Sequence, residues 1–226
     1  MKKVVSMFAI AAIFAAAGFS ETSAGGDSAP VWQPYNGAEI KFEVLRKGKP
    51  FGEHIVSFEV NPSGLIKATS DVNLKVKVGP FTAFKYALDS VETWDENTLI
   101  ALEGTTNDNG DKTYVRAVSN GQNLSIDGSA YSGDVPLGVI PSSHWNTEQI
   151  RSEEMLSTED GRLIPMVIIP KGTEMLTIDG EQILTRRYLL DSDIDIDLWY
   201  DDQGRWLRLT FEARGQTIEY RLTQLY

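Results

Sequence analysis

The sequence predicts an all-β, mainly antiparallel protein: a single up-and-down barrel or a strongly bent half-barrel with a short helical insertion. A two-sheet sandwich is the alternative. Apolar and polar residues alternate with a period of two over most of the chain, which is typical of half-buried strands. Clusters of Gly, Pro, Asn and Asp separate the alternating runs, as expected for hairpin turns. A length of 226 residues fits one large β domain.

The first 24 residues have the composition of a secretory leader. Lys2 and Lys3 precede the uncharged run Val4 to Phe19, and Thr22 and Ala24 are small enough for a cleavage site. This run is short for a membrane span, which needs about 20 apolar residues, so we predict cleavage after Ala24 rather than an uncleaved anchor. We therefore expect a periplasmic protein with no membrane span after cleavage. Residues 25–37 would be a loose N-terminal segment, and residues 38–226 a single domain.

The predicted strands alternate with turn signals along the whole domain. The long run 66–78 has apolar residues on one face and lysines among the polar residues on the other, which indicates a curved sheet with one dry face. Asn107 to Asp111 is a strong hairpin signal. The other predicted strands are 40–44, 56–60, 81–95, 99–106, 112–119, 124–127, 162–170, 175–179, 181–190, 194–200, 205–213 and 217–225.

Residues 129–158 interrupt this pattern and are predicted to form a non-strand insertion or lid. Pro136, Gly138 and Pro141 break any regular element there. A short helix is expected within 146–156, capped by Asn146 or Thr147.

Composition excludes several classes of function. The chain has no cysteine, so disulfides, thiolate metal sites and cysteine nucleophiles are excluded. A net charge of −11 argues against a general binder of nucleic acids or of anionic membranes, which would need a basic surface. Two histidines cannot form a three-histidine zinc site, and no phosphate-binding loop or dinucleotide motif is present. We expect no cofactor and no resident metal.

Both histidines are candidate ligand-binding residues. His54 shares its strand face with Val56 and Phe58, so it is either a buried core histidine or a polar group facing an apolar cavity. His144 lies in the insertion, where Ser143, His144, Trp145 and Asn146 either line a cavity mouth or anchor a packed loop. A serine–histidine hydrolase centred on His144 is a further alternative, although the Gly-x-Ser-x-Gly elbow is missing.

An acidic run at residues 191–202 completes the set of candidate positions. Alternation places Asp193, Asp195, Asp197 and Trp199 on one strand face. This face is either solvated and neutralised by cross-strand arginines, or it binds calcium or a cationic partner. Arg187, Tyr188 and Trp199 are the predicted ligand-binding residues of this region.

Several stretches together resemble an uncharacterised family of exported proteobacterial proteins, a domain of unknown function. The resembling stretches are 42–46 with Gly48, Gly52 and His54, then 141–146, 195–201, 205–206 and 211–215. The resemblance implies a periplasmic location and a single domain, and it supplies no activity. The meander with a short insertion also looks like lipoprotein-carrier and lipocalin-type barrels, which is an analogy of fold alone.

These observations favour a binding protein over an enzyme. We expect a periplasmic carrier for an apolar or amphipathic ligand, such as a lipid, an acyl chain or a lipoprotein segment. The alternative is a cell-envelope module that docks a protein partner through the acidic face or an edge strand.

Overall fold

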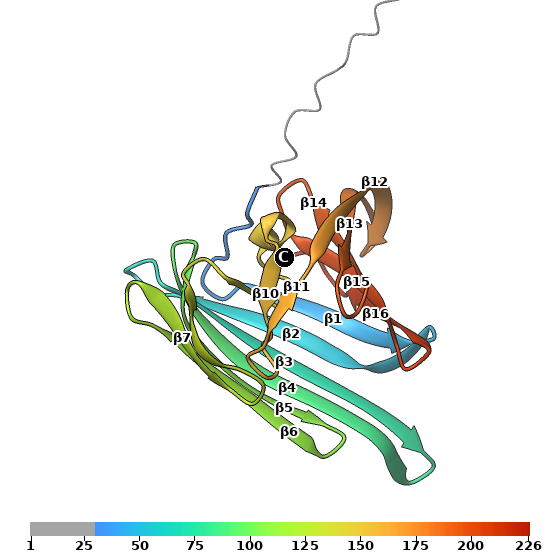
Figure 1. The fold of residues 1–226 in the computed structure, drawn as a ribbon. Helices are drawn as coiled ribbons and strands as arrows, with labels where there is room; N and C mark the ends of the chain where they lie inside the picture. Colours follow the sequence, from blue (N-terminus) through green and yellow to red (C-terminus); the bar gives the residue numbers. More distant parts are fainter. Residues whose placement is uncertain (1–29) are drawn as a thin grey trace, which may run out of the picture.

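A computed structural model describes residues 30–226. The predicted leader 1–24, its cleavage site and residues 25–29 lie outside the described residues. The described part of the chain contains a 13-stranded antiparallel sheet, a three-stranded sheet and one 3₁₀ helix (Figure 1). The all-β prediction is confirmed.

The large sheet consists of two arms that meet where β1 pairs with β16. The strand order is β12-β13-β14-β15-β16-β1-β2-β3-β4-β5-β6-β7-β8. The first arm contains β1 (Glu39–Arg46), β2 (Lys49–Val60), β3 (Ile66–Val78), β4 (Phe81–Asp95), β5 (Thr98–Asp108), β6 (Asp111–Ser119), β7 (Asn123–Gly128) and β8 (Ser132–Pro136). The second arm contains β12 (Val167–Ile178), β13 (Glu181–Asp191), β14 (Ile196–Asp201), β15 (Trp206–Ala213) and β16 (Gln216–Leu222).

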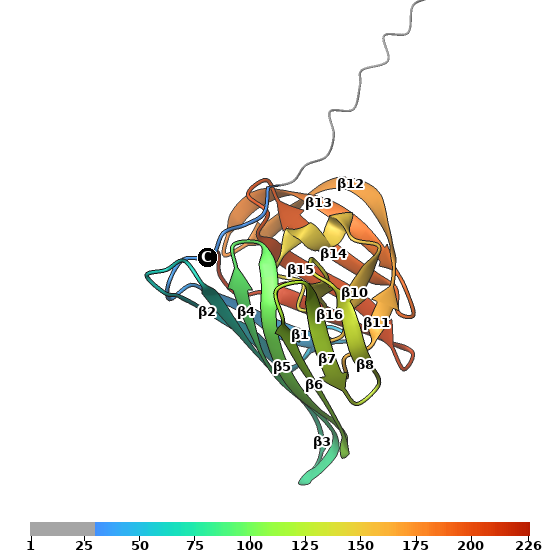
Figure 2. The ribbon, with the colours of Figure 1, turned by 60° about the vertical axis from the view of Figure 1, so that its left-hand side comes forward.

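The large sheet is curved and open. The second arm curls over the concave face of the first arm, as Figures 1 and 2 show. The outermost strands of this sheet, β8 and β12, are not paired with each other. Of the predicted alternatives, the described residues therefore form the strongly bent half-barrel.

Alternation along the strands produces the dry concave face. Ile40, Phe42 and Val44 on β1 have no exposed surface, and Val56 and Phe58 on β2 are equally buried. Because side chains in a strand point to opposite faces in turn, the polar residues between them lie on the convex face.

The chain between the two arms forms an inner segment, residues 140–165. It contains β9 (Ile140–Pro141), the 3₁₀ helix η1 (Thr147–Arg151), β10 (Glu154–Leu156) and β11 (Leu163–Pro165). The segment contacts both arms: Trp145 packs against Phe58 and Trp94 of the first arm, and the Tyr200 hydroxyl of the second arm donates to the His144 carbonyl over 2.8 Å.

The prediction that residues 129–158 contain no strands is wrong. The strands β8, β9 and β10 lie within this range, and β8 belongs to the large sheet. These strands have only two to five residues, too few for a period of two to be recognised. The predicted helix is confirmed as η1, although it is shorter than 146–156; Asn146 is its cap, accepting a hydrogen bond from the Glu148 amide.

Two glycines allow the inner segment to lie directly on the sheet. A Cβ atom on Gly104 of β5 would approach the Thr158 carbonyl oxygen to 2.2 Å. A Cβ atom on Gly128 of β7 would approach the Asp160 carbonyl oxygen to 2.4 Å. Both distances are shorter than van der Waals contact, so a larger residue at either position would push the segment away from the sheet.

Residues 30–37 correct the prediction of a loose N-terminal segment, as far as this segment is described. Trp32 is buried against Phe58 and Tyr226, with ring centroids 5.2 and 4.8 Å away. The Asn36 side chain accepts a hydrogen bond from the Val60 amide. A segment rich in Gly, Pro and Ser can still dock when one large aromatic residue has a site in the core.

The acidic run also differs from the predicted strand 194–200. β14 begins at Ile196, whereas Asp193 lies in a bend and Asp195 between this bend and the strand, so the four predicted residues do not share one strand face. The Ser192 hydroxyl donates to the Ile194 carbonyl, a local bond that competes with strand pairing. Asp197 is paired with Arg187, and Asp193 lies 3.4 Å from Arg162.

Candidate functional site

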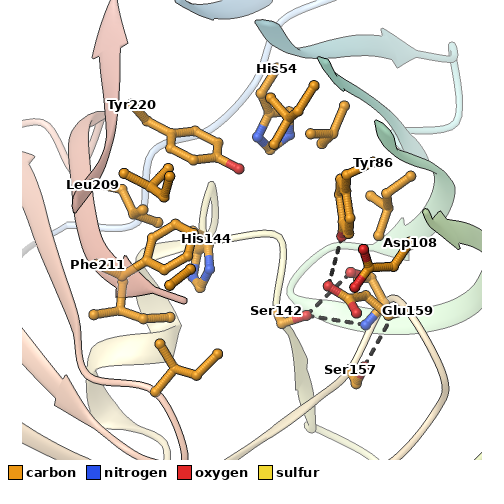
Figure 3. A pocket seen from close by; sticks show the side chains of 18 of the residues that line it. His54, Tyr86, Asp108, Ser142, His144, Ser157, Glu159, Leu209, Phe211 and Tyr220 are labelled. Carbon is orange, nitrogen blue, oxygen red and sulfur yellow. Dashed lines mark hydrogen bonds between the residues drawn. The ribbon is translucent and has the colours of Figure 1, made fainter. Parts of the chain in front are cut away.

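A cavity of about 830 Å³ lies on the concave face, between the two arms and the inner segment. It extends to the end of the sheet that carries the β1–β2, β3–β4, β5–β6 and β15–β16 turns. Figure 3 shows Leu209, Phe211 and Tyr220 of the second arm facing Tyr86 of the first arm across this space. Its apolar wall includes Val72, Leu74, Leu88, Ile164, Ile196, Leu209, Phe211, Ile218 and Tyr220.

His54 and His144 both line this cavity, although 90 residues separate them in the sequence (Figure 3). His54 comes from β2 and His144 from the inner segment. Trp206 lies between them and the core, with its ring centroid 5.6 Å from that of His54 and 5.7 Å from that of His144. The two imidazoles therefore form the polar inner end of the cavity, next to the packed aromatic core.

His54 is a buried histidine whose ring nitrogens have no hydrogen-bond partner in the described residues. Its ring lies among Phe42, Trp206 and Tyr220. Burial, together with a smaller effect of the nearby His144, lowers its pKa from 6.5 to about 3. His54 is therefore neutral at pH 7 and offers one donor and one acceptor. Because buried polar groups are nearly always paired, this side chain is suited to a ligand's hydrogen-bonding group.

His144 is held in a fixed orientation. Its backbone is in the left-handed region, with φ = 65°, and Tyr200 holds its carbonyl. Its Nδ1 lies 2.9 Å from Gln149 Oε1, and Gln149 Nε2 donates to the Met155 sulfur. This network assigns the proton to His144 Nδ1 and leaves Nε2 as an acceptor. Burial lowers the pKa of His144 to about 4, against the opposing effect of the Gln149 bond.

Ser143 also lines the cavity, whereas Trp145 and Asn146 do not. Trp145 is buried in the core, and its indole N–H donates to Glu92 Oε2 over 3.0 Å. Trp94 donates to the same oxygen over 2.8 Å. Burial raises the pKa of Glu92 above its usual 4.5, and hydrogen bonds from its neighbours oppose this effect. Trp145 and Asn146 thus anchor the inner segment.

Arg187, Tyr188 and Trp199 lie away from the cavity. Arg187 makes a two-fold hydrogen bond to Asp197, at 2.8 and 2.7 Å, and its guanidinium lies 5.1 Å from the Trp199 ring centroid. Trp199 also donates to Glu174 and contacts Arg208. Tyr188 is buried near Tyr200. The cluster is saturated by its own contacts, as the solvated-face interpretation of the acidic run expects.

The structure adds residues to the site that sequence reasoning missed. The Tyr86 hydroxyl donates to Glu159 over 2.7 Å, which connects β4 to the inner segment (Figure 3). Arg214 pairs with Asp108 over 2.8 Å at the open end. Tyr86 shares its strand face with Leu88, so alternation could have placed it in the cavity. Glu159 follows no periodic pattern, and no sequence signal indicates its position.

The neighbours of His144 differ from those in a serine hydrolase. The partner of His144 Nδ1 is an amide, whereas a serine hydrolase needs a carboxylate there. Ser142 Oγ lies 3.2 Å from the Thr158 hydroxyl. Between residues 30 and 226 no three His, Asp or Glu side chains gather as they would to hold a metal ion.

The model of a family known as DUF6134, a domain of unknown function, matches residues 42–223. The chain belongs to this family. The match confirms the resemblance to an uncharacterised family that the sequence motifs indicated. No curated protein matches the chain.

One solved structure supports the fold of this DUF6134 chain. A beta-barrel-like protein of the DUF1849 family from Brucella abortus is similar with a TM-score of 0.58 and 9% identity, over 82% of this chain and 95% of that one. LprF from Mycobacterium bovis overlaps 83% of this chain and 84% of its own, with 11% identity, but its TM-score is only 0.32. The first comparison shows a shared fold and nothing about activity. In the described part, no helix is long and apolar enough to cross a membrane.

Proposed function

We propose that this protein is an exported, periplasmic binding or carrier protein for an apolar or amphipathic ligand, such as a lipid, an acyl chain or a segment of a lipoprotein. The observation that carries the proposal is the cavity between the two arms. Its volume of about 830 Å³ falls within the range of about 300–1,000 Å³ that is usual for small-molecule sites.

The chemistry of the cavity walls defines the class of ligand. Val72, Leu88 and Ile218 belong to a small buried cluster on the wall, so an apolar chain placed there would leave water. His54 and His144 are neutral at pH 7 and supply hydrogen bonds without charge. The walls therefore suit a ligand with an apolar body and one uncharged or weakly polar group at its inner end.

The leader supports the proposed location. A basic start, an uncharged run and small residues before Ala24 are the features of an exported chain. A ligand that dissolves poorly in water needs a protein to cover its apolar surface in an aqueous compartment such as the periplasm.

Variants that fill the cavity test this function. Ser70 and Ser90 are buried on neighbouring strands and line the cavity, so Ser70→Phe or Ser90→Phe would occupy its volume. We expect either variant to weaken the binding of a fluorescent acyl-chain probe at least about tenfold, because a filled site excludes the chain. Probe titration measures the affinity, and native mass spectrometry of protein from its own host identifies bound ligand.

Ser125→Phe provides the matched control. Ser125 lies on β7 between the buried Leu124 and Ile126, so it is on the convex face. Near-UV circular dichroism checks that each variant keeps its packing. Equal probe affinity in the cavity variants and in the control would contradict the proposal, as would a wild-type protein that binds no probe.

A further inference from the structure

The β3–β4 hairpin extends beyond the rest of the sheet. Pairing of β2 with β3 ends at Gly52 and Leu74, and pairing of β4 with β5 begins at Tyr86 and Asp108. Residues 75–85 therefore have strand partners only among themselves and form a two-stranded ribbon, whose base is joined to the β5–β6 turn by a hydrogen bond from the Asn109 amide to the Lys85 carbonyl. With about 3.3 Å per residue, this ribbon projects roughly 15 Å. Figures 1 and 2 both show this hairpin projecting beyond the ends of the neighbouring strands.

The tip of this ribbon is apolar and exposed. Phe81 is 74% exposed, the highest value among the exposed large apolar side chains of the described residues. Pro80 and Ala83 beside it are also exposed. A two-stranded ribbon has no second layer to cover such a side chain, so its exposure is a feature of the hairpin itself.

The ribbon and its neighbour are basic in an acidic protein. Residues 72–88 contain Lys75, Lys77 and Lys85 and no acidic residue, and the β1–β2 turn region 45–52 contains three basic residues and no acidic one. The rest of the chain is acidic enough to bring the net charge to −11. The three ribbon lysines are exposed.

The same hairpins form the open end of the cavity. Phe51, Ala83 and Phe84 line it, and the rings of Phe51 and Phe84 are stacked with their centroids 6.0 Å apart. Arg46 lies over Phe51 and Arg214 over Phe84, at 5.9 and 5.0 Å from the ring centroids. The aromatic rings at the base of the ribbon thus border the cavity with arginines over them, of which Arg214 is paired with Asp108.

We propose that the β3–β4 ribbon docks on an anionic phospholipid bilayer, with Phe81 inserted between the headgroups and the basic residues of the β1–β2 and β3–β4 hairpins facing the lipid phosphates. This inference rests on the proposed function, since it gives the cavity a lipid surface at which to load or release its ligand. Charge complementarity favours this occupant: a basic, apolar projection on an acidic protein is attracted to an anionic surface while the remainder is repelled. Insertion of one aromatic ring and attraction of a basic patch are two weak interactions, which together give reversible binding to the bilayer.

Vesicle flotation tests the docking. Residues 25–226 include every described strand, so protein without the predicted leader avoids binding through the leader's own apolar run. We expect binding to vesicles of phosphatidylcholine with 30% phosphatidylglycerol, weaker binding to pure phosphatidylcholine vesicles, and loss at high salt. Lys75→Gln with Lys77→Gln should reduce partitioning about 30-fold, and Phe81→Ser about tenfold.

Matched controls separate the ribbon from general charge and hydrophobicity. Lys67→Gln with Lys171→Gln removes the same charge elsewhere, and Val118→Ser removes an exposed apolar residue from β6. Neither control should change partitioning more than twofold. Equal loss in the controls and the ribbon variants, or no preference for anionic vesicles, would overturn the proposal.

The acyl-probe titration in solution keeps the two proposals apart. A ribbon variant that binds the probe normally but fails to float supports docking by the ribbon. A wild-type protein that binds the probe and ignores vesicles overturns the docking and leaves the carrier function intact. A protein that floats through the ribbon without binding the probe overturns the carrier function alone.

Discussion

The two ends of the concave face are built from the same strands and differ in how they are filled. At the packed end, the indole rings of Trp94, Trp145 and Trp206 are almost completely buried. At the hollow end, a separate small cluster that includes Val72, Leu88 and Ile218 faces the cavity. The inner segment makes the difference: its Trp145 fills the packed end, whereas at the other end its side chains, among them Ser142, Ser143, Met155 and Ile164, border the cavity without filling it. The position of the largest side chain along a buried segment thus helps to decide where a curved sheet keeps a binding site.

The largest expected effect comes from emptying the packed end. Trp145→Ala should lower the free energy of unfolding by about 4 kcal/mol, because it removes a buried ring and a hydrogen bond to Glu92. Leu88→Ala at the hollow end should cost about 2 kcal/mol, because its side chain already borders empty space. Denaturant unfolding of both variants measures the contrast. Equal losses would mean that the cavity collapses in solution and that the two ends are packed alike.

Acid should lower the free energy of unfolding through the protonation of His54, which lines the cavity. The folded pKa of His54, about 3, lies below its ordinary value of 6.5, so its neutral form is favoured by folding. This stability is present above pH 6.5 and is lost as the pH falls toward 3. Between pH 6.5 and pH 4 the loss from His54 amounts to about 3 kcal/mol.

His54→Gln removes this titration while keeping a polar side chain. The variant should lose less free energy of unfolding than the wild type when the pH falls from 6.5 to 4. Urea unfolding at a series of pH values makes the comparison, and His144, with its pKa lowered to about 4, leaves a residual slope in the same direction. A variant with the same acid slope as the wild type would show that His54 is not desolvated.

The part of the fold with regular alternation could be predicted from the sequence. Alternation alone places His54 on the concave face with Val56 and Phe58, and the structure confirms this. Alternation does not reveal whether other side chains fill the space over the concave face, because that depends on where the inner segment packs. The short strands β8, β9 and β10 have no pattern to recognise, and the closeness of His144 to His54 arises only from tertiary packing.

The acidic run shows a different limit. Its alternating aspartates indicate one strand, yet only Asp197 and Asp201 lie in β14. β14 begins where Ile196 pairs with Leu190 of β13 and Phe211 of β15. The neighbouring strands therefore determine this register, and the sequence of the acidic run does not. An arginine opposite the aspartates could be predicted, whereas the register that places Arg187 across from Trp199, away from the cavity, could not.

The smallest expected effect on the free energy of unfolding comes from Glu92 at the packed end. Its dependence on pH is opposite to that of His54. Burial raises the pKa of Glu92 above 4.5, so its stabilising contribution is present below pH 4.5 and is lost as the pH rises through the folded value. Trp94 and Trp145 donate to its Oε2 and oppose this shift, which keeps the effect below that of His54.

Glu92→Gln keeps an acceptor for both indoles and removes the charge. Its free energy of unfolding should improve relative to the wild type as the pH rises from 4.5 to 8, and parallel pH profiles would show that Glu92 titrates normally. Together the two substitutions would divide the pH dependence of the free energy of unfolding by region: a loss as the pH falls below 6.5 from His54 at the hollow end, and a loss as the pH rises above 4.5 from Glu92 at the packed end.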